Sequence, residues 1–159
     1  MEKKLGVIGG SGLYEMEGLT DIRTQALSTP FGAPSDEIVS GRLGDTTLYF
    51  LPRHGRGHRI LPSEINYRAN IYAMKSLGVE WILSASAVGS MKEEIHPGDM
   101  VVPDQFIDRT FRRASTFFGE GIVAHVPFAH PVCEKFRKVV VESSKHCDAR
   151  THDGGTYLC

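Results

Sequence analysis

The chain has 159 residues, of which 41% are hydrophobic and 23% are charged, and its 18 basic and 19 acidic side chains nearly cancel. A chain of this length has enough residues for one domain with a buried core. A formal net charge of −1 gives no electrostatic reason to expect nucleic acid or an anionic membrane as the main partner, although a small anion needs only a local cluster of donors.

Cysteine usage and hydropathy indicate the class of protein. The three cysteines lie far apart without a Cys-x-x-Cys pair, which favours a reducing cytoplasm over a disulfide framework. No apolar stretch approaches the roughly 18 residues that a membrane span requires. We therefore expect a cytoplasmic protein.

The first half of the chain alternates short apolar runs with glycine turns. Residues 5–8 predict a buried strand that enters a glycine turn over 9–12. Residues 36–52 predict a hairpin, with strands over 37–43 and 46–51 on either side of a Gly44–Asp45 turn. A basic loop follows over 53–59. A helix is expected over 64–77, because apolar residues recur at helical spacing and Gly78 stops them.

The second half continues the alternation. Residues 81–88 are the strongest candidate for a buried strand, residues 100–103 predict a short strand, and residues 131–146 predict a helix. Another strand begins at residue 156, where only four residues remain. We interpret this as a truncated or cleaved chain, with a naturally short domain as the alternative. Strands alternating with helices predict an α/β fold built on a central sheet.

Three segments that each follow a predicted strand carry groups able to bind an anion. The glycine turn can bring backbone N–H groups and the Ser11 hydroxyl close to a ligand. The basic loop offers the planar fork of Arg53 and the ring of His54. Ser86 lies near the end of the strand predicted over 81–88, where open α/β sheets bind ligands. Each segment alone also fits a plain turn, a solvated loop or tight packing, but together they predict one phosphate site.

Other kinds of site fit the sequence less well. The Walker pattern is missing, and Glu15 stands where the dinucleotide fingerprint needs its third glycine. His54 and His58 would need a helix to bind a metal together, but two intervening glycines and Pro62 oppose one, so we predict no metal. His125 lies in an apolar stretch and can line a ligand pocket or simply be packed or exposed. From the residues alone, the function is that of an α/β enzyme with a phosphate or carboxylate site.

As a set, the motifs of the chain resemble one known family, the 5'-methylthioadenosine phosphorylases of the purine nucleoside phosphorylase group. The motifs are GVIGGSGL at 6–13, TPFGAPS at 29–35, RHGRGH at 53–58, NYRAN at 66–70, AVGS at 87–90, PGD at 97–99 and DQFIDRT at 104–110. The resemblance implies a mixed central sheet flanked by helices, with residues 1–159 as the amino-terminal part of a single phosphorylase domain. Such enzymes are usually homotrimers. With inorganic phosphate as co-substrate and no cofactor, they convert 5'-methylthioadenosine to adenine and 5-methylthioribose 1-phosphate.

The resemblance also implies roles for individual residues. The positions that match the family's phosphate contacts are Ser11, Arg53, His54, Ser86 and Ala87. Of these, we assign Arg53, His54 and Ser86 to catalysis. His58 and His125 match residues near the methylthio-ribose, and the His125 loop is expected to reach the site of a neighbouring subunit.

The sequence leaves the base preference open. The family's purine-recognition residues, its ribose-binding methionine and the carboxylates that assist departure of the base correspond to positions beyond residue 159. We expect adenine, with a 6-oxopurine nucleoside (methylthioinosine, inosine or guanosine) as the alternative. Outside the family, the alternatives are a nucleotide-binding oxidoreductase and an inactive fragment that serves folding or assembly.

Overall fold

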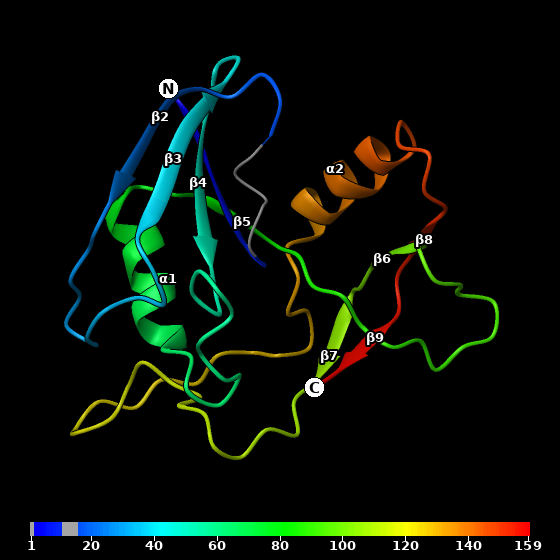
Figure 1. The fold of residues 1–159 in the computed structure, drawn as a ribbon. Helices are drawn as coiled ribbons and strands as arrows, with labels where there is room; N and C mark the ends of the chain where they lie inside the picture. Colours follow the sequence, from blue (N-terminus) through cyan, green and yellow to red (C-terminus); the bar gives the residue numbers. More distant parts are fainter. Residues whose placement is uncertain (1, 11–15) are drawn as a thin grey trace. The chain divides into compact units, whose positions relative to one another are not determined.

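The computed structural model describes residues 2–10 and 16–159 of the chain (Figure 1). Backbone contacts divide it into unit 1, which comprises Met1–Ala87 and Arg112–Phe117, and unit 2, which comprises Val88–Phe111 and Phe118–Cys159. The elements of unit 1 are β1 (Lys3–Gly9), β2 (Thr20–Gln25), β3 (Ile38–Leu43), β4 (Thr46–Pro52), α1 (Tyr67–Ser76) and β5 (Trp81–Ser84). The elements of unit 2 are β6 (Met100–Val102), β7 (Gln105–Ile107), α2 (Glu134–Ser144), β8 (Thr151–Asp153) and β9 (Thr156–Leu158).

Unit 1 is built on a five-stranded mixed sheet with the strand order β2-β3-β4-β1-β5. β1 runs parallel to both of its neighbours, β4 and β5, whereas β3 runs antiparallel to β4 and to β2. The β3–β4 pair is the hairpin expected from the sequence, and Gly44 adopts the positive φ of 61° that its tight turn needs. The sheet confirms the predicted mixed α/β fold.

The core of unit 1 lies on both faces of this sheet, because neighbouring residues of a strand point to opposite faces. On one face, buried side chains of β1, β3 and β4 pack with Ala73 and Met74 of α1, and Figure 1 shows this helix lying along the sheet. The residues that alternate with them form a second cluster on the other face: Val7, Val39, Leu48 and Phe50. Burial of both faces anchors the strands whose ends carry the candidate site.

Helix α1 begins later than the sequence predicted, at Tyr67 rather than residue 64. The side chain of Asn66 caps it by accepting a hydrogen bond from the Ala69 N–H at 3.2 Å, so the backbone before Asn66 is not helical. At the other end the helix stops at Ser76, and Gly78 follows with φ 78°. Glycine is favoured there because it adopts a left-handed conformation without steric cost.

The prediction of a buried strand over 81–88 is wrong in its length and its burial. β5 ends at Ser84 and lies at the edge of the sheet, where β1 is its one partner strand among the described residues. Trp81 is therefore exposed, and Ile82 and Leu83 are only half-buried. The sequence also missed β2, β7 and β8: β2 is almost fully exposed, and the other two have three residues each, which is too short for a hydrophobic period.

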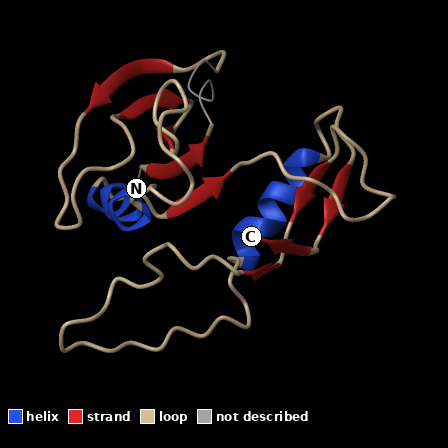
Figure 2. Cartoon of the chain, turned by 60° about the horizontal axis from the view of Figure 1, so that its bottom comes forward, coloured by secondary structure: helices blue, strands red, loops and turns tan. Residues whose placement is uncertain are grey.

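Unit 2 consists of helix α2 and two pairs of short parallel strands, β6 with β8 and β7 with β9. The strands β6 and β9 and helix α2 confirm three elements that the sequence predicted. Arg137 of α2 contacts Asp153 of β8 and Glu134, and this pairing links the helix to the strands. The long segment 108–133 between β7 and α2 contains no helix or extended strand, and Figure 2 draws it as a loop. Among the described residues, no helix has the length and apolarity to cross a membrane.

Candidate functional site

The candidate site lies at the carboxyl ends of three neighbouring parallel strands of the unit 1 sheet, β4, β1 and β5. Gly9 of β1 is in register with Pro52 of β4, and Ile8 of β1 is in register with Ser84 of β5. Two backbone hydrogen bonds extend this register by one residue: Arg53 N donates to Gly9 O at 3.0 Å, and Ala85 N donates to Ile8 O at 2.9 Å. The segments that follow β4 and β5 therefore leave the sheet on either side of the end of β1, at the carboxyl ends of the strands, where α/β sheets bind ligands.

Arg53 connects two of these segments through its side chain. Its Nη1 donates a hydrogen bond to the carbonyl oxygen of Ala85 at 2.9 Å. Because β1 lies between β4 and β5, the guanidinium spans the end of β1 and reaches the segment that contains Ser86 and Ala87. A guanidinium has five N–H donors, so one bond to a carbonyl leaves several for a ligand. Ser86 and Ala87 are both exposed and accessible to such a ligand.

His54 and His58 lie against one another in the basic loop. Their rings stack with centroids 5.0 Å apart and planes 12° apart. The positive φ angles of Gly55, Gly57 and His58 (69°, 80° and 54°) fold the loop tightly enough to bring the two rings together. His54 Nδ1 lies 2.9 Å from the carbonyl oxygen of Ile60. A carbonyl only accepts hydrogen bonds, so Nδ1 carries a proton there, and Nε2 is the nitrogen available to a ligand.

The stacked histidines do not resemble a metal site. Parallel rings lie face to face rather than directing their nitrogens to one point. Within residues 2–10 and 16–159, no group of three or more histidine, cysteine, aspartate or glutamate side chains is arranged to hold a metal ion.

The arginines of the basic loop differ in their charge partners. Arg56 pairs with Glu37 at 3.7 Å, and Arg59 pairs with Asp36 at 3.6 Å. Arg53 has no carboxylate partner among the described residues, since its side-chain hydrogen bond goes to a neutral carbonyl. Of the three arginines, Arg53 therefore carries the charge that is least compensated and best placed for an anion.

The structure brings together only part of the predicted site. It places Arg53 against the 85–87 segment and stacks His54 on His58. Ser11 lies outside the described residues. His125 is exposed in the loop of unit 2.

Two residues of this region were missed from the sequence. Ala85 contributes the carbonyl oxygen that accepts the hydrogen bond from Arg53. Its position directly before Ser86 could have indicated this role from the sequence. Asp36 contributes a carboxylate, as shown by its contact with Arg59. The predicted hairpin could have indicated this position of Asp36. A hairpin over 36–52 returns the chain to its starting point and so brings residues 36 and 37 near the basic loop that follows the second strand.

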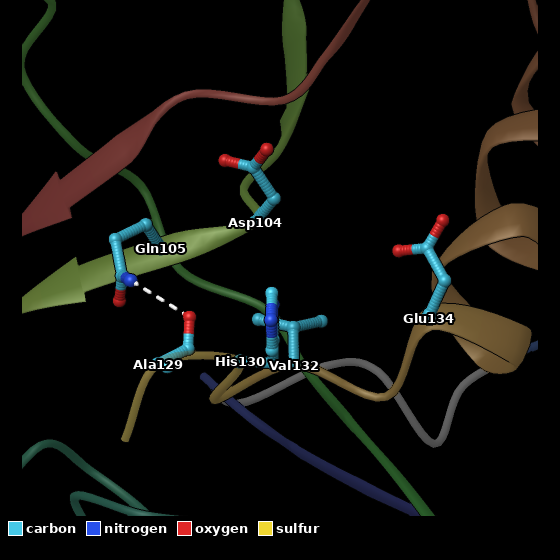
Figure 3. A pocket seen from close by; sticks show the side chains of 6 residues that line it. All are labelled: Asp104, Gln105, Ala129, His130, Val132 and Glu134. Atoms are coloured by element: carbon cyan, nitrogen blue, oxygen red, sulfur yellow. Dashed lines mark hydrogen bonds between the residues drawn. The ribbon is translucent and has the colours of Figure 1, made fainter. Parts of the chain in front are cut away.

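Unit 2 contains a separate pocket of about 480 Å³, which Figure 3 shows from close by. Its wall is formed by Asp104, Gln105, Ala129, His130, Val132 and Glu134. Gln105 Nε2 donates to Ala129 O at 3.3 Å, and Asp104 Oδ1 accepts a hydrogen bond from Gly155 N at 3.0 Å. Hydrogen bonding from Arg137 holds the pKa of Glu134 below its ordinary value. Of the residues predicted for the phosphate site, those that the structure describes (Arg53, His54, Ser86 and Ala87) do not line this pocket.

Comparisons with known proteins agree with the resemblance drawn from the motifs. The chain is 62% identical to the S-methyl-5'-thioadenosine phosphorylase of Geobacter sulfurreducens, over 100% of this chain and 56% of that protein. It is 50% identical to a crystal structure of a methylthioadenosine phosphorylase from an antarctic soil metagenomic library, with a TM-score of 0.94 over 100% of this chain and 57% of that one. A methylthioadenosine phosphorylase from Schistosoma mansoni in complex with adenine gives 38% identity and a TM-score of 0.90, over 98% of this chain and 64% of that one.

The chain thus spans little more than half the length of the relatives that it matches. The sequence pattern of the Phosphorylase superfamily matches residues 4–159, which is nearly the whole chain. The chain belongs to the Phosphorylase superfamily.

Proposed function

We propose that this chain supplies the phosphate-binding part of a 5'-methylthioadenosine phosphorylase, which converts 5'-methylthioadenosine and inorganic phosphate to adenine and 5-methylthioribose 1-phosphate. The observation that carries the proposal is the Arg53 guanidinium, which spans the ends of three parallel strands and bonds to Ala85 O at 2.9 Å. Arg53 has no carboxylate partner among the described residues, and its guanidinium lies beside exposed Ser86 and Ala87, so these groups can donate together to one phosphate.

The reaction needs an oriented anion more than a reactive side chain. As the bond between the sugar and the purine loosens, positive charge develops on the sugar, and the phosphate both stabilises this charge and bonds to the anomeric carbon. Arg53, the His54 Nε2 atom and the Ser86 hydroxyl are proposed to hold the phosphate for this attack, with the Ser11 hydroxyl and the Ala87 N–H as further donors. No covalent intermediate on the protein and no cofactor enter this scheme.

The contacts with the methylthio-ribose and the identity of the base are proposed from the stacked histidines and from the relatives. His58 stacks on His54, which would place its ring next to the phosphate and so near the sugar. His125 is proposed to reach the sugar of a neighbouring subunit in a homotrimer. Adenine is proposed as the base because the Geobacter relative is a methylthioadenosine phosphorylase at 62% identity, and the Schistosoma relative was solved with adenine. The three cysteines are exposed and form no disulfide within the described part of the chain, which fits a cytoplasmic location.

The test uses a chimera in which residues 1–159 are joined to the part of the Geobacter relative outside the matched segment. Release of adenine from 5'-methylthioadenosine is followed with and without phosphate, and release of hypoxanthine from methylthioinosine is measured in parallel. We expect adenine release that depends on phosphate. Faster hypoxanthine release would establish the 6-oxopurine alternative. No base release from a folded chimera, or tight binding of a nicotinamide dinucleotide in its place, would refute the proposal.

A further inference from the structure

Asp36 lies at the start of the β3–β4 hairpin and contacts the basic loop that follows it. Its carboxylate is only 7% exposed. Asp36 Oδ2 accepts a hydrogen bond from the backbone N–H of Arg56 at 2.6 Å and lies 3.6 Å from Arg59 Nη2. Its Oδ1 accepts a hydrogen bond from Glu37 N at 2.8 Å. One buried carboxylate therefore holds the loop at two points, through a main-chain group and through a side chain.

The segment that carries Asp36 is itself fixed to the core. Ser35 N donates to Asn70 Oδ1 at 2.8 Å, and Asn70 Nδ2 donates to Ser35 Oγ at 2.9 Å. Both residues are buried, and Asn70 belongs to α1. These two hydrogen bonds prevent Asp36 from moving with the loop, so Asp36 can act as an anchor for it.

The loop packs closely against this anchor. A Cβ atom added to Gly55 would lie 3.3 Å from Ser35 O and 3.0 Å from Arg59 Nε, and the φ of Gly55 is 69°. Only glycine fits this approach without strain. Arg59 then passes the restraint to His54, because Arg59 N donates a hydrogen bond to His54 O at 3.1 Å.

We propose that Asp36 is a positioning residue of the phosphate site, which fixes the basic loop so that Arg53 and His54 present their donors to phosphate. The role rests on the proposed function. It acts through geometry, because the bonds to Arg56 N and Arg59 set the path of the loop.

The principal test is Asp36→Asn in the chimera described above, with Glu37→Gln as the matched control. Asparagine keeps the shape and one acceptor but loses the charge that holds Arg59. The KM for phosphate should rise about 10- to 100-fold, the range typical of residues that orient a ligand-binding group. The KM for 5'-methylthioadenosine should stay unchanged. Glu37→Gln removes only an exposed ion pair and should alter the phosphate KM less than about twofold.

A second variant guards against misfolding. The Arg59 side chain is 65% exposed, so Arg59→Gln does not disturb the core. It removes the ion pair with Asp36, and it should also raise the phosphate KM. An unchanged phosphate KM in both Asp36→Asn and Arg59→Gln would overturn the proposal. So would an equal rise in both KM values together with a lowered unfolding midpoint, since that pattern indicates a purely structural residue.

Failure of the proposed function is recognised separately. A folded wild-type chimera that shows no phosphorolysis refutes the activity, and the positioning role is then decided on the 159-residue chain by NMR. In the ¹⁵N-labelled chain, Asp36→Asn should shift the amide signal of Arg56, which donates to the Asp36 carboxylate, whereas Glu37→Gln should leave that signal in place. An Arg56 amide signal that Asp36→Asn does not move would overturn the anchoring role whatever the activity.

Discussion

Replacement of Arg53 by alanine removes the one arginine of the basic loop that has no carboxylate partner among the described residues. The side chain is half-buried and held in place by its bond to Ala85 O at 2.9 Å. A hydrogen bond to a charged partner contributes about 1.5–3 kcal/mol. At about 1.4 kcal/mol per tenfold change, its loss should reduce kcat/KM for phosphate by about 10- to 150-fold. Arg53→Lys should restore only part of this, because an ammonium group keeps the charge but lacks the planar fork.

The assay measures initial rates of adenine release in the chimera while phosphate is varied at saturating 5'-methylthioadenosine, and then with the roles reversed. Arg53→Ala should change the phosphate dependence strongly and the nucleoside KM little. The unfolding midpoint should also fall, since the charge-assisted bond from the Arg53 guanidinium to Ala85 O contributes at most about 1.5–3 kcal/mol.

Arg56→Ala is the matched control for this experiment. It lies in the same loop and has the same chemistry, but its guanidinium is about half exposed and pairs with Glu37 at 3.7 Å. Such surface pairs contribute about 0–1 kcal/mol, so the phosphate dependence should hardly change. Equal effects of Arg53→Ala and Arg56→Ala would refute the assignment, because they would show that the loop attracts phosphate by its total charge. An unaltered phosphate KM in Arg53→Ala would refute it directly.

Three further predictions concern stability and are read from urea unfolding of the chain. Asn70→Ala should lower the free energy of unfolding by about 1–3 kcal/mol, because it leaves two buried hydrogen-bonding groups without partners, and a loss below 0.5 kcal/mol would contradict this. Gly41→Ala should cost about 1–3 kcal/mol, since the new Cβ would lie 2.6 Å from Leu19, and an unchanged midpoint would show that Leu19 moves aside freely. Hydrogen bonding from His152 holds the pKa of Asp99 below its ordinary value of 3.8, so its stabilising contribution is present above that pH and is lost as the pH falls through the lowered pKa. Asp99→Asn should therefore weaken the acid dependence of the midpoint as the pH falls below the ordinary pKa of 3.8, and an identical pH profile in the variant would exclude this role.

The elements that could be predicted from the sequence depend on neighbours along the chain. The hairpin follows from two alternating runs around Gly44, and β1 follows from a short apolar run before a glycine turn. Helix α1 was expected from its apolar spacing, but its first residue was placed three positions too early. The capping bond of Asn66, which sets that residue, depends on the conformation of a single side chain.

The elements that could not be predicted depend on which strands become neighbours. Residues 81–88 have the composition of a buried strand, but within the described part of the chain β5 pairs with β1 only, and its residues are exposed or half-buried. β2 carries few apolar residues, and it forms because β3 offers it a free edge. A strand's burial and its existence are in such cases properties of the sheet rather than of the segment.

The sequence by itself determined the kinds of donor in the candidate site and the strands that they follow, because both are encoded within a few residues. Only the tertiary structure decided that Arg53 reaches Ala85, that His58 stacks on His54, and that Asp36 holds the basic loop. These contacts arise from the order β4-β1-β5, the register of the parallel strands and the left-handed residues of the loop. Arg53 and Ala85, which are 32 positions apart, meet because the pairing of backbone groups across a sheet brings the ends of distant strands together.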